Sequence, residues 1–366
     1  MQPRLSPRKE AILRALVDEY IRTGEPVPSK VLADQLLSVY ASGVSPATVR
    51  NELAALEAAG LILQPHVSAG RAPTDLGYRY FVERLMGESR LSLDEQRLIR
   101  HQFYQVQHQL DEWIRLTAAI LAQALQSAAI ITQPRADEAR LRHFELLSLT
   151  DTVALLVLAL EDGTVRQERL LLDLPMSQEE LSRLTARLTE RFRRATANDV
   201  VEWLESARLA PDERVALESL ARLLARPDIF SPDSFHAEGI TKLLQRREFS
   251  QADPERVRRV VEALEENSFL PRIARQALES DGVQVIIGAE NESDAFKDMS
   301  VIVARYGVPG QLGGLLGVVS PTRMQYSRAI AVVRYMTEML NDLLADAYDA
   351  YDTAETYGTP GTFRRE

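Results

Sequence analysis

The residues best suited to chemistry lie in a predicted helix from Pro46 to Ala59. With about 100° between successive residues, one side of this helix is apolar and the other carries small and hydrogen-bonding side chains. The apolar side comprises Val49, Leu53 and Leu56, and the opposite side comprises Ala47, Asn51, Ala54 and Ala58, flanked by Thr48 and Arg50. Small side chains let a helix approach base edges, the Asn51 amide can pair with adenine, and Arg50 can reach guanine or a phosphate. This face is a candidate for DNA recognition, while its alanines are also typical of a solvent-facing helix.

The segments around this helix contain the elements that would position it. The start and stop signals of three short helices are Pro7, Gly24, Ser29, Ser45 with Pro46, and Gly60. Proline and serine are typical of helix starts, and glycine is typical of helix ends. A short strand at 61–63 then precedes a loop at 65–73 that contains glycine and arginine. This order predicts a winged helix-turn-helix domain over residues 1–90.

The predicted wing, residues 65–73, adds further candidate DNA contacts. Arg71 lies between Gly70 and Ala72, which suits a wing tip at a phosphate or in the minor groove, although a solvated turn arginine fits the same pattern. His66 can contact a phosphate or anchor the wing by a hydrogen bond. The full candidate set for DNA binding is Ser45, Ala47, Thr48, Arg50, Asn51, His66, Ser68, Gly70 and Arg71.

Charge is distributed unevenly along the 366 residues. Residues 1–90 contain eleven basic and ten acidic residues, whereas the remaining 276 contain 32 basic and 43 acidic ones. A sequence pI near 5.3 normally argues against nucleic-acid binding, because phosphate contacts need a positive face. The near-neutral N-terminal segment can still present such a face. Only four of the 43 basic residues are lysine, so any phosphate recognition would rely on arginine.

Composition excludes several other classes of protein. The chain has 45% hydrophobic and 26% charged residues, which is ordinary for globular domains, and it has no cysteine. Disulfides and thiolate metal sites are therefore excluded, and a cytoplasmic location is expected. The longest apolar run, Val153–Leu160, is too short to span a membrane, and Met1–Leu5 lack the apolar core of a signal peptide. No membrane association is predicted.

No catalytic residue, metal site or cofactor is expected either. Four glycines resemble a phosphate-binding loop, but they precede a strand rather than a helix N-terminus, and close backbone packing also explains them. They are Gly310, Gly313, Gly314 and Gly317. His101 and His108 are separated by about 10.5 Å of helical rise, too far to share one metal ion. Acidic residues mostly follow helix-surface spacing, so no general acid–base pair stands out.

Beyond residue 90 the periodicity changes several times. A heptad pattern from Ile99 to Ala124 predicts one long helix, and three runs between 144 and 172 predict strands. Helical spacing returns in 181–192 and in most of 210–280, before three more strands between 283 and 319 and a helix at 329–344. Arg323 and Arg328, near the start of that helix, can bind an anion or tie the helix to acidic neighbours. The alternation predicts a split α+β fold.

Several motifs resemble those of the bacterial heat-inducible transcription repressors, the HrcA family. The N-terminal motifs are Thr23–Val27, Ser45–Glu52 and Pro65–Thr74, and the C-terminal ones are Ile287–Asn291, Ser300–Tyr306 and Pro321–Arg328. The resemblance spans nearly the whole chain and is loose over 175–280. Pro28, Lys30 and Ser320 depart from the family pattern. The departures weaken a bidentate phosphate contact at Lys30 and leave the turn geometry at Ser320 open.

The resemblance implies a domain organisation and a function. It implies a winged-helix domain at 1–90, a GAF-like α+β domain at 91–210 and 281–345, an inserted and mainly helical dimerisation domain at 211–280, and a flexible tail at 346–366. It also implies a homodimer that binds an inverted-repeat operator in double-stranded DNA upstream of chaperone operons. The GroE chaperonin would keep the repressor competent, and heat, which occupies the chaperonin, would relieve repression.

Two other functions fit the same residues. One is a transcription regulator whose split GAF-like domain binds a small molecule and shifts the DNA-competent population. The other is a protein-interaction module with a vestigial winged helix. A ligand that raises the thermal midpoint would favour the first, and absence of salt-sensitive DNA binding would favour the second.

Overall fold

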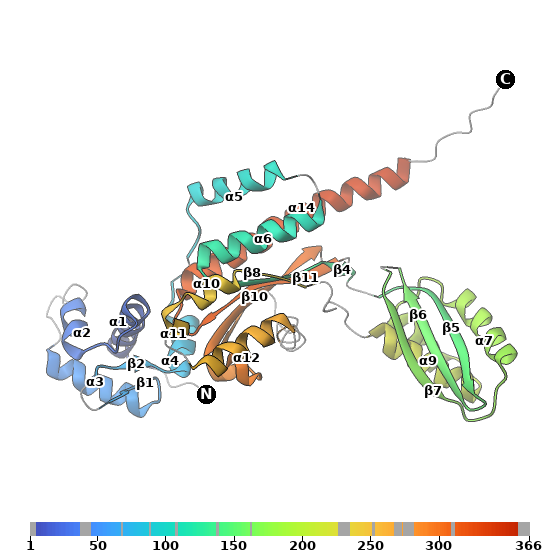
Figure 1. Cartoon of the computed structure of the whole chain (residues 1–366), viewed down its shortest axis with the longest axis horizontal. Helices are drawn as coiled ribbons and strands as arrows, with labels where there is room; N and C mark the ends of the chain where they lie inside the picture. Colours follow the sequence, from blue (N-terminus) through green and yellow to red (C-terminus); the bar gives the residue numbers. More distant parts are fainter. Residues whose placement is uncertain are drawn as a thin grey trace, which may run out of the picture. The chain divides into compact units, whose positions relative to one another are not determined.

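The chain forms two compact units of mixed α+β structure (Figure 1). The computed structural model describes residues 5–36, 45–66, 69–87, 89–106, 109–136, 139–161, 163–225, 235–250, 253–266, 273, 282–308 and 312–357. Unit 1 comprises Met1–Gln133, Pro232–Arg305 and Leu315–Asp342, and unit 2 comprises Pro134–Ser231, Tyr306–Gly314 and Leu343–Glu366. The predicted α+β class is confirmed.

Unit 1 begins with a small domain of short helices, residues 5–85, called here the N-terminal domain. It contains α1 (Pro7–Thr23), α2 (Ser29–Leu36), α3 (Pro46–Ala58), β1 (Ile62–Leu63), β2 (Ala72–Pro73), α4 (Asp75–Tyr80) and the π-helix η1 (Phe81–Leu85). Ser6 accepts a hydrogen bond from the Lys9 N–H at the start of α1, and Gly24 ends that helix with φ +72°. The strands pair antiparallel, with Ile62 opposite Pro73. The three predicted helices and the strand after them are confirmed.

The rest of unit 1, called here the sheet domain, is built on an antiparallel sheet of the order β8-β3-β11-β10-β9. The strands are β3 (Ala128–Thr132), β8 (Phe235–Glu238), β9 (Val283–Ile287), β10 (Met299–Val308) and β11 (Leu312–Pro321), and β4 (Arg135–Ala136) pairs with the start of β11. A Cβ at Gly317 would lie 2.2 Å from the Ile302 carbonyl oxygen, so this glycine allows close backbone packing between neighbouring strands. The packing explanation holds for this member of the glycine cluster.

Helices cover both faces of this sheet. They are α5 (Leu93–Gln105), α6 (Leu110–Leu125), α10 (Ile240–Leu244), α11 (Arg247–Ser250), α12 (Pro254–Glu265) and α14 (Tyr326–Tyr357), with 3-10 turns at Gly288–Glu290 and Asp294–Phe296. Figure 1 shows α6 and α14 on one side of the sheet and α12 on the other. The apolar sides of α6 and α14 are buried, including Trp113, Leu121, Val333 and Leu340.

Two predictions about these helices are wrong. The heptad pattern is divided between α5 and α6, because the backbone is extended at Val106 with φ −88° and ψ 136°. The last helix continues to Tyr357, so the flexible tail predicted from residue 346 does not begin there. Polar composition suggested a loose segment, but the first helix breakers are Gly358 and Pro360. Residues 358–366 lie outside the described part of the chain.

Unit 2 has two layers, one antiparallel sheet and a set of helices that cover one face of it. Strands β5 (Leu141–Thr150), β6 (Val153–Leu160) and β7 (Val165–Leu171) pair antiparallel in that order. Helices α7 (Gln178–Arg191), α8 (Ala197–Ser206) and α9 (Pro211–Ala225) share the core with the sheet. Buried core residues include Phe144, Leu146, Leu156, Leu158, Leu184 and Leu217.

The boundaries predicted for the inserted domain, 211–280, do not coincide with unit 2. The strands at 141–171 form their own sheet instead of joining that of unit 1, because their apolar face is covered by α7 to α9. Residues 235–265 return to unit 1 as β8 and α10 to α12. Unit 2 therefore includes residues that the resemblance assigns to the first part of the GAF-like domain.

Candidate nucleic-acid interface

Helix α3 has the two faces that its sequence predicts. Val49 and Leu56 are fully buried, and Leu53 is 3% exposed. Ala47, Arg50, Asn51, Ala54 and Ala58 are exposed, and Thr48 is half-buried. Arg50 has no ion-pair partner among the residues that the structure describes. The exposed face thus combines three alanines with one amide and one guanidinium, which suits close approach to another molecule.

The first turn of α3 is fixed by a serine cap. Ser45 has extended backbone dihedrals, and its Oγ accepts a hydrogen bond from the Thr48 N–H at 3.1 Å. The Ser45 and Thr48 hydroxyl oxygens are 3.0 Å apart and hydrogen-bonded. Pro46 takes the first helical position, where no N–H is needed. The hydroxyls of Ser45 and Thr48 therefore order the start of the helix.

Ser45→Ala is expected to destabilise the N-terminal domain by about 1 kcal/mol, because the Thr48 N–H loses its acceptor. Chemical denaturation followed by helical circular dichroism measures this loss. Ser45→Asp is the matched control, because aspartate keeps a capping oxygen and should retain the stability. Equal stability of the alanine variant and the parent would contradict the capping role.

The loop between β1 and β2, which the sequence predicts to be a wing, is held against the preceding loop and α3. The backbone of Arg71 exchanges hydrogen bonds with that of Val27, at 2.8 and 2.9 Å. A Cβ at Gly70 would lie 2.4 Å from the Val27 carbonyl carbon, so only glycine permits this contact. The Arg71 guanidinium lies 3.1 Å from the Glu57 carboxylate of α3. Gly70 and Arg71 therefore lie at the base of the wing, and the prediction that Arg71 occupies its tip is wrong.

The other predicted wing residues are placed differently. His66 is exposed, and its carbonyl oxygen accepts the Ala69 N–H at 2.8 Å. Ser68 lies outside the described residues. Glu57 was not predicted as a partner of Arg71, because 14 residues separate the two and no local spacing rule links a helix to a wing. The structure thus brings α3, Arg71 and Glu57 together, with His66 on the same loop.

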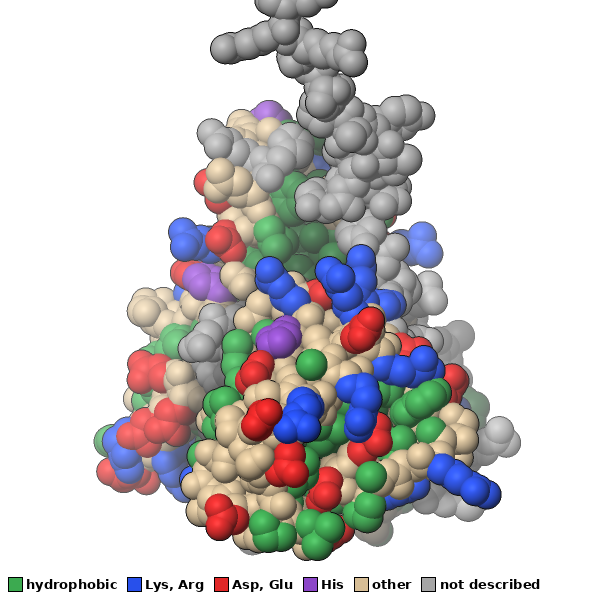
Figure 2. All heavy atoms as spheres, turned by 90° about the vertical axis from the view of Figure 1, so that its right-hand side faces the viewer, with side chains coloured by type: hydrophobic (Ala, Val, Ile, Leu, Met, Phe, Trp, Pro, Cys, Tyr) green, Lys and Arg blue, Asp and Glu red, His purple; other side chains and the backbone are tan. Residues whose placement is uncertain are grey.

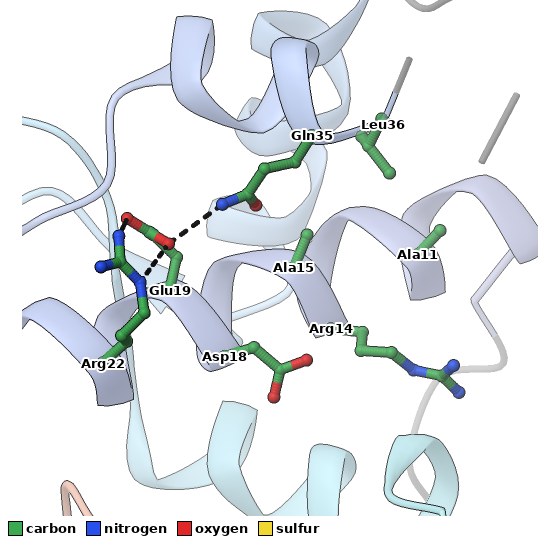
Figure 3. Close-up of a pocket in the computed structure, with 8 residues that line it drawn as sticks. All are labelled: Ala11, Arg14, Ala15, Asp18, Glu19, Arg22, Gln35 and Leu36. Carbon is green, nitrogen blue, oxygen red and sulfur yellow. Dashed lines mark hydrogen bonds and ion pairs between the residues drawn. The ribbon is translucent and has the colours of Figure 1, made fainter. Parts of the chain in front are cut away.

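A hydrogen-bonded carboxylate joins α1 to α2 and so positions the helix pair before α3 (Figure 3). Glu19 accepts hydrogen bonds from Arg22, at 2.5 Å, and from Gln35, at 3.0 Å. The bond from Arg22 is the main reason that the pKa of Glu19 lies below its ordinary value. These residues line a hollow of about 460 Å³ whose lining comes from α1 and α2. None of the predicted DNA-binding residues lines it, so the hollow is separate from the α3 face.

The described part of the chain offers few other candidate functional sites. Figure 2 shows one face of the molecule, on which acidic and basic side chains are intermingled. Among the described residues, no group of three histidine or acidic side chains could hold a metal ion. His101 is hydrogen-bonded to Gln105, and His108 lies outside the described residues. No helix in the described ranges is both long and apolar enough to cross a membrane.

Comparison with known proteins identifies the family. Residues 111–330 match the family model described as the HrcA protein C-terminal domain. The chain is 46% identical over 350 residues to the heat-inducible transcription repressor HrcA of Roseiflexus castenholzii, with 94% of this chain and 96% of that protein covered. Its identity to the repressor of the same name from Herpetosiphon aurantiacus is 44% over 353 residues, with 95% and 98% covered.

A solved structure supports the fold. The crystal structure described as that of a hypothetical protein at 2.2 Å resolution aligns with a TM-score of 0.55 and 21% identity, covering 94% of this chain and 99% of that one. The curated relatives are transcription repressors and not enzymes. Residues 111–330 match the family model, and the chain is 46% identical to a member along nearly its full length. The chain therefore belongs to the HrcA family of heat-inducible transcription repressors.

Proposed function

We propose that this repressor binds an inverted-repeat operator upstream of chaperone operons as a homodimer and releases it on heat stress. The observation that carries the proposal is the exposed face of α3, with Asn51 and Arg50 among small residues. In this proposal residues 1–90 are a winged helix-turn-helix whose recognition helix is α3, and the sheet domain is GAF-like. A twofold dimer presents two such helices about one turn of DNA apart, or a multiple, which matches an inverted repeat.

Base and backbone contacts are assigned to different residues. Asn51 reads an adenine edge and Arg50 reads guanine or a phosphate, while Ala47 lets the helix approach. Ser45, Thr48, His66, Ser68, Gly70 and Arg71 complete the proposed DNA-binding set. Since Arg71 is tied to Glu57 at the base of the wing, its contribution is a phosphate contact that also holds the wing on α3.

Unit 2 supplies a surface for the dimer. One face of its sheet is buried under α7 to α9, and the other carries apolar side chains that remain wholly or partly exposed. The register places Leu147, Leu155 and Leu171 on that second face, together with Val153, Val157 and Val165. Leu147 is 42%, Val165 65% and Leu171 76% exposed. Contiguous exposed apolar patches are typical of protein interfaces.

Control by the GroE chaperonin and a cytoplasmic location are proposed from the family. Heat would occupy the chaperonin with unfolded protein and leave less repressor in its competent form. The proposal predicts that chaperonin raises operator binding and that excess unfolded protein reverses this effect.

The test is direct binding to DNA. The purified chain is titrated with an inverted-repeat fragment from a chaperone promoter and with a scrambled fragment, at about 50 and 200 mM salt, with and without GroE. We expect preference for the repeat, an affinity that falls steeply with salt, and tighter binding with chaperonin. Equal weak binding to both fragments would overturn the proposal.

Two substitutions separate the proposed contacts. Asn51→Ala should reduce discrimination at one base position by about 1–3 kcal/mol, because a bidentate base contact is lost. Arg71→Ala should weaken binding to all sequences alike and lower the salt slope by about one, because one phosphate contact is lost. Affinity measured on operators with single base changes distinguishes the two. Equal losses of specificity in both variants would contradict the assigned roles.

A ligand-gated form of the same function rests on one observation. A cavity of about 510 Å³ lies among α5, α6, β8, α10 and α14, within the size range of small-molecule sites. Its apolar wall includes Ile99, Leu116 and Ile120, and its charged wall includes Lys242 and Arg328 with Glu95 and Glu238. Arg328 pairs with Glu95 at 2.9 Å. A small molecule that raises the thermal unfolding midpoint of unit 1 in a thermal-shift screen would favour this version.

A further inference from the structure

Within unit 1, polar side chains join the N-terminal domain to the sheet domain. Arg323 is central to this junction and lies between β11 and α14, in the sheet domain. Its Nη1 donates a hydrogen bond to the Ile21 carbonyl oxygen at 2.8 Å, in the last turn of α1. Its Nε lies 2.5 Å from the Glu248 carboxylate of α11. A planar guanidinium can make both contacts at once, and a lysine ammonium on a flexible stem cannot fix them in the same way.

The surroundings of Arg323 are shaped for this contact. Its side chain is 19% exposed, and that of Glu248 is 23% exposed. A Cβ at Gly24 would lie 3.3 Å from the Arg323 guanidinium carbon, so the glycine that ends α1 also leaves room for the arginine. The Arg323 carbonyl oxygen accepts a hydrogen bond from Arg246 at 3.0 Å, which holds the backbone of the loop. Arginine near the negative C-terminal end of a helix is favourable.

A second contact joins α4 to the sheet domain. Asp75 accepts a hydrogen bond from the Ala289 N–H at 2.9 Å, and Arg79 pairs with the Glu290 carboxylate. The ring of Tyr78, in α4, also contacts that of Tyr326 at the start of α14, with ring centroids 5.6 Å apart. The Arg323 and Asp75–Arg79 contacts thus hold two different helices, α1 and α4. A single contact would allow rotation about itself, whereas two contacts fix an orientation.

We propose that Arg323 is a positioning residue that sets the orientation of α3 relative to the sheet domain and thereby the half-site spacing that the dimer accepts. The proposal rests on the proposed function. Helix α1 packs against α3, so the direction of α3 follows that of α1. Two rigidly held recognition helices bind best at one half-site spacing. Domains on loose tethers accept several spacings, but the effective concentration of the second domain at its half-site is lower.

The experiment compares Arg323→Met with the matched control Arg328→Met. Arg328 lies five positions further along, pairs with Glu95 of α5 and, among the described residues, makes no hydrogen bond or ion pair with the N-terminal domain. Affinities are measured for a single half-site and for inverted repeats with a series of spacer lengths. For Arg323→Met we expect half-site affinity within about twofold of the parent, a loss of about tenfold or more at the best spacing, and a flatter dependence on spacing. Arg328→Met should match the parent.

A second variant distinguishes a change in the orientation of α3 from a folding defect. Glu248 Oε2 is buried without a hydrogen-bond partner among the described residues, so Arg323→Met alone leaves a poorly compensated charge. The double variant Arg323→Met/Glu248→Met removes both charges and should fold like the parent, because such apolar replacements are often neutral for stability. It should show the same flattened dependence on spacing. An unchanged spacing preference in a folded double variant would overturn the proposal.

A measurement without DNA separates this inference from the proposed function. The chain has no cysteine, so Arg14→Cys in α1 and Glu338→Cys in α14 provide two unique sites for spin labels. Both positions are exposed and lie in unit 1. The distance distribution should broaden in the double variant and stay narrow with Arg328→Met. Absence of operator binding by the parent would overturn the proposed function, whereas an unchanged distribution would overturn the role of Arg323.

Discussion

Leu155→Asp is expected to convert the proposed dimer to a monomer and to weaken binding to the full operator by about 100-fold or more, while half-site affinity stays unchanged. Leu155 lies in the middle of β6, on the sheet face that we propose as the dimer surface, directly opposite Leu147. An aspartate enclosed in an apolar dimer surface would carry a large desolvation cost. In the monomer its carboxylate would face solvent beside Arg169, the residue opposite on β7, so unit 2 should remain folded.

Ala186→Asp provides the matched control for this substitution. Ala186 is exposed on α7, the helix layer on the other face of the sheet, and the change introduces the same charge. Sedimentation velocity and binding to half-site and full operator are measured for both variants. A Leu155→Asp chain that stays dimeric would show that the dimer forms through another surface.

Phe144→Ala is expected to lower the free energy of unfolding of unit 2 by about 3–5 kcal/mol. Phe144 is 1% exposed and is one of the largest side chains in the core between the sheet and α7 to α9. Because the two units have separate cores, scanning calorimetry should resolve two transitions, of which only the one from unit 2 moves.

Arg142→Ala, two residues away on the same strand, controls for changes to β5 itself. Arg142 is exposed, so its truncation should change stability by about 0.5 kcal/mol or less. A single transition that moves as a whole with Phe144→Ala would contradict independent units. It would mean that unit 2 and unit 1 unfold cooperatively.

The N-terminal domain could be predicted from sequence because its signals are local. Ser45 and Pro46 set the start of α3, and the spacing of Val49, Leu53 and Leu56 sets its buried face. Each of these signals acts within one or two helical turns. The exposed face that carries Asn51 and Arg50 followed directly from that spacing.

Long-range partners could not be predicted in the same way. The strands between 141 and 171 were recognised, but the sheet to which they belong depends on which helices cover them, and periodicity does not carry that information. The position of Arg71 depends on a bridge to Val27 and an ion pair with Glu57, both outside its local segment. The Arg323 contact with Ile21 joins residues from opposite ends of the chain.

The sheet of unit 1 also constrains how the chain folds during synthesis. Strand β3 is an interior strand of the sheet, yet both of its neighbours, β8 and β11, follow much later in the chain. Ile131 is synthesised well before its partner Leu316. At a synthesis rate of roughly 5–20 residues per second, the interval between them is roughly 10 to 40 s. During that time the sheet and helices of unit 2 between residues 141 and 225 can fold on the ribosome, while the apolar strand β3 lacks its partners and is prone to aggregate. A repressor with this topology would depend on chaperone capacity at every round of translation, and its supply would fall when that capacity is exhausted.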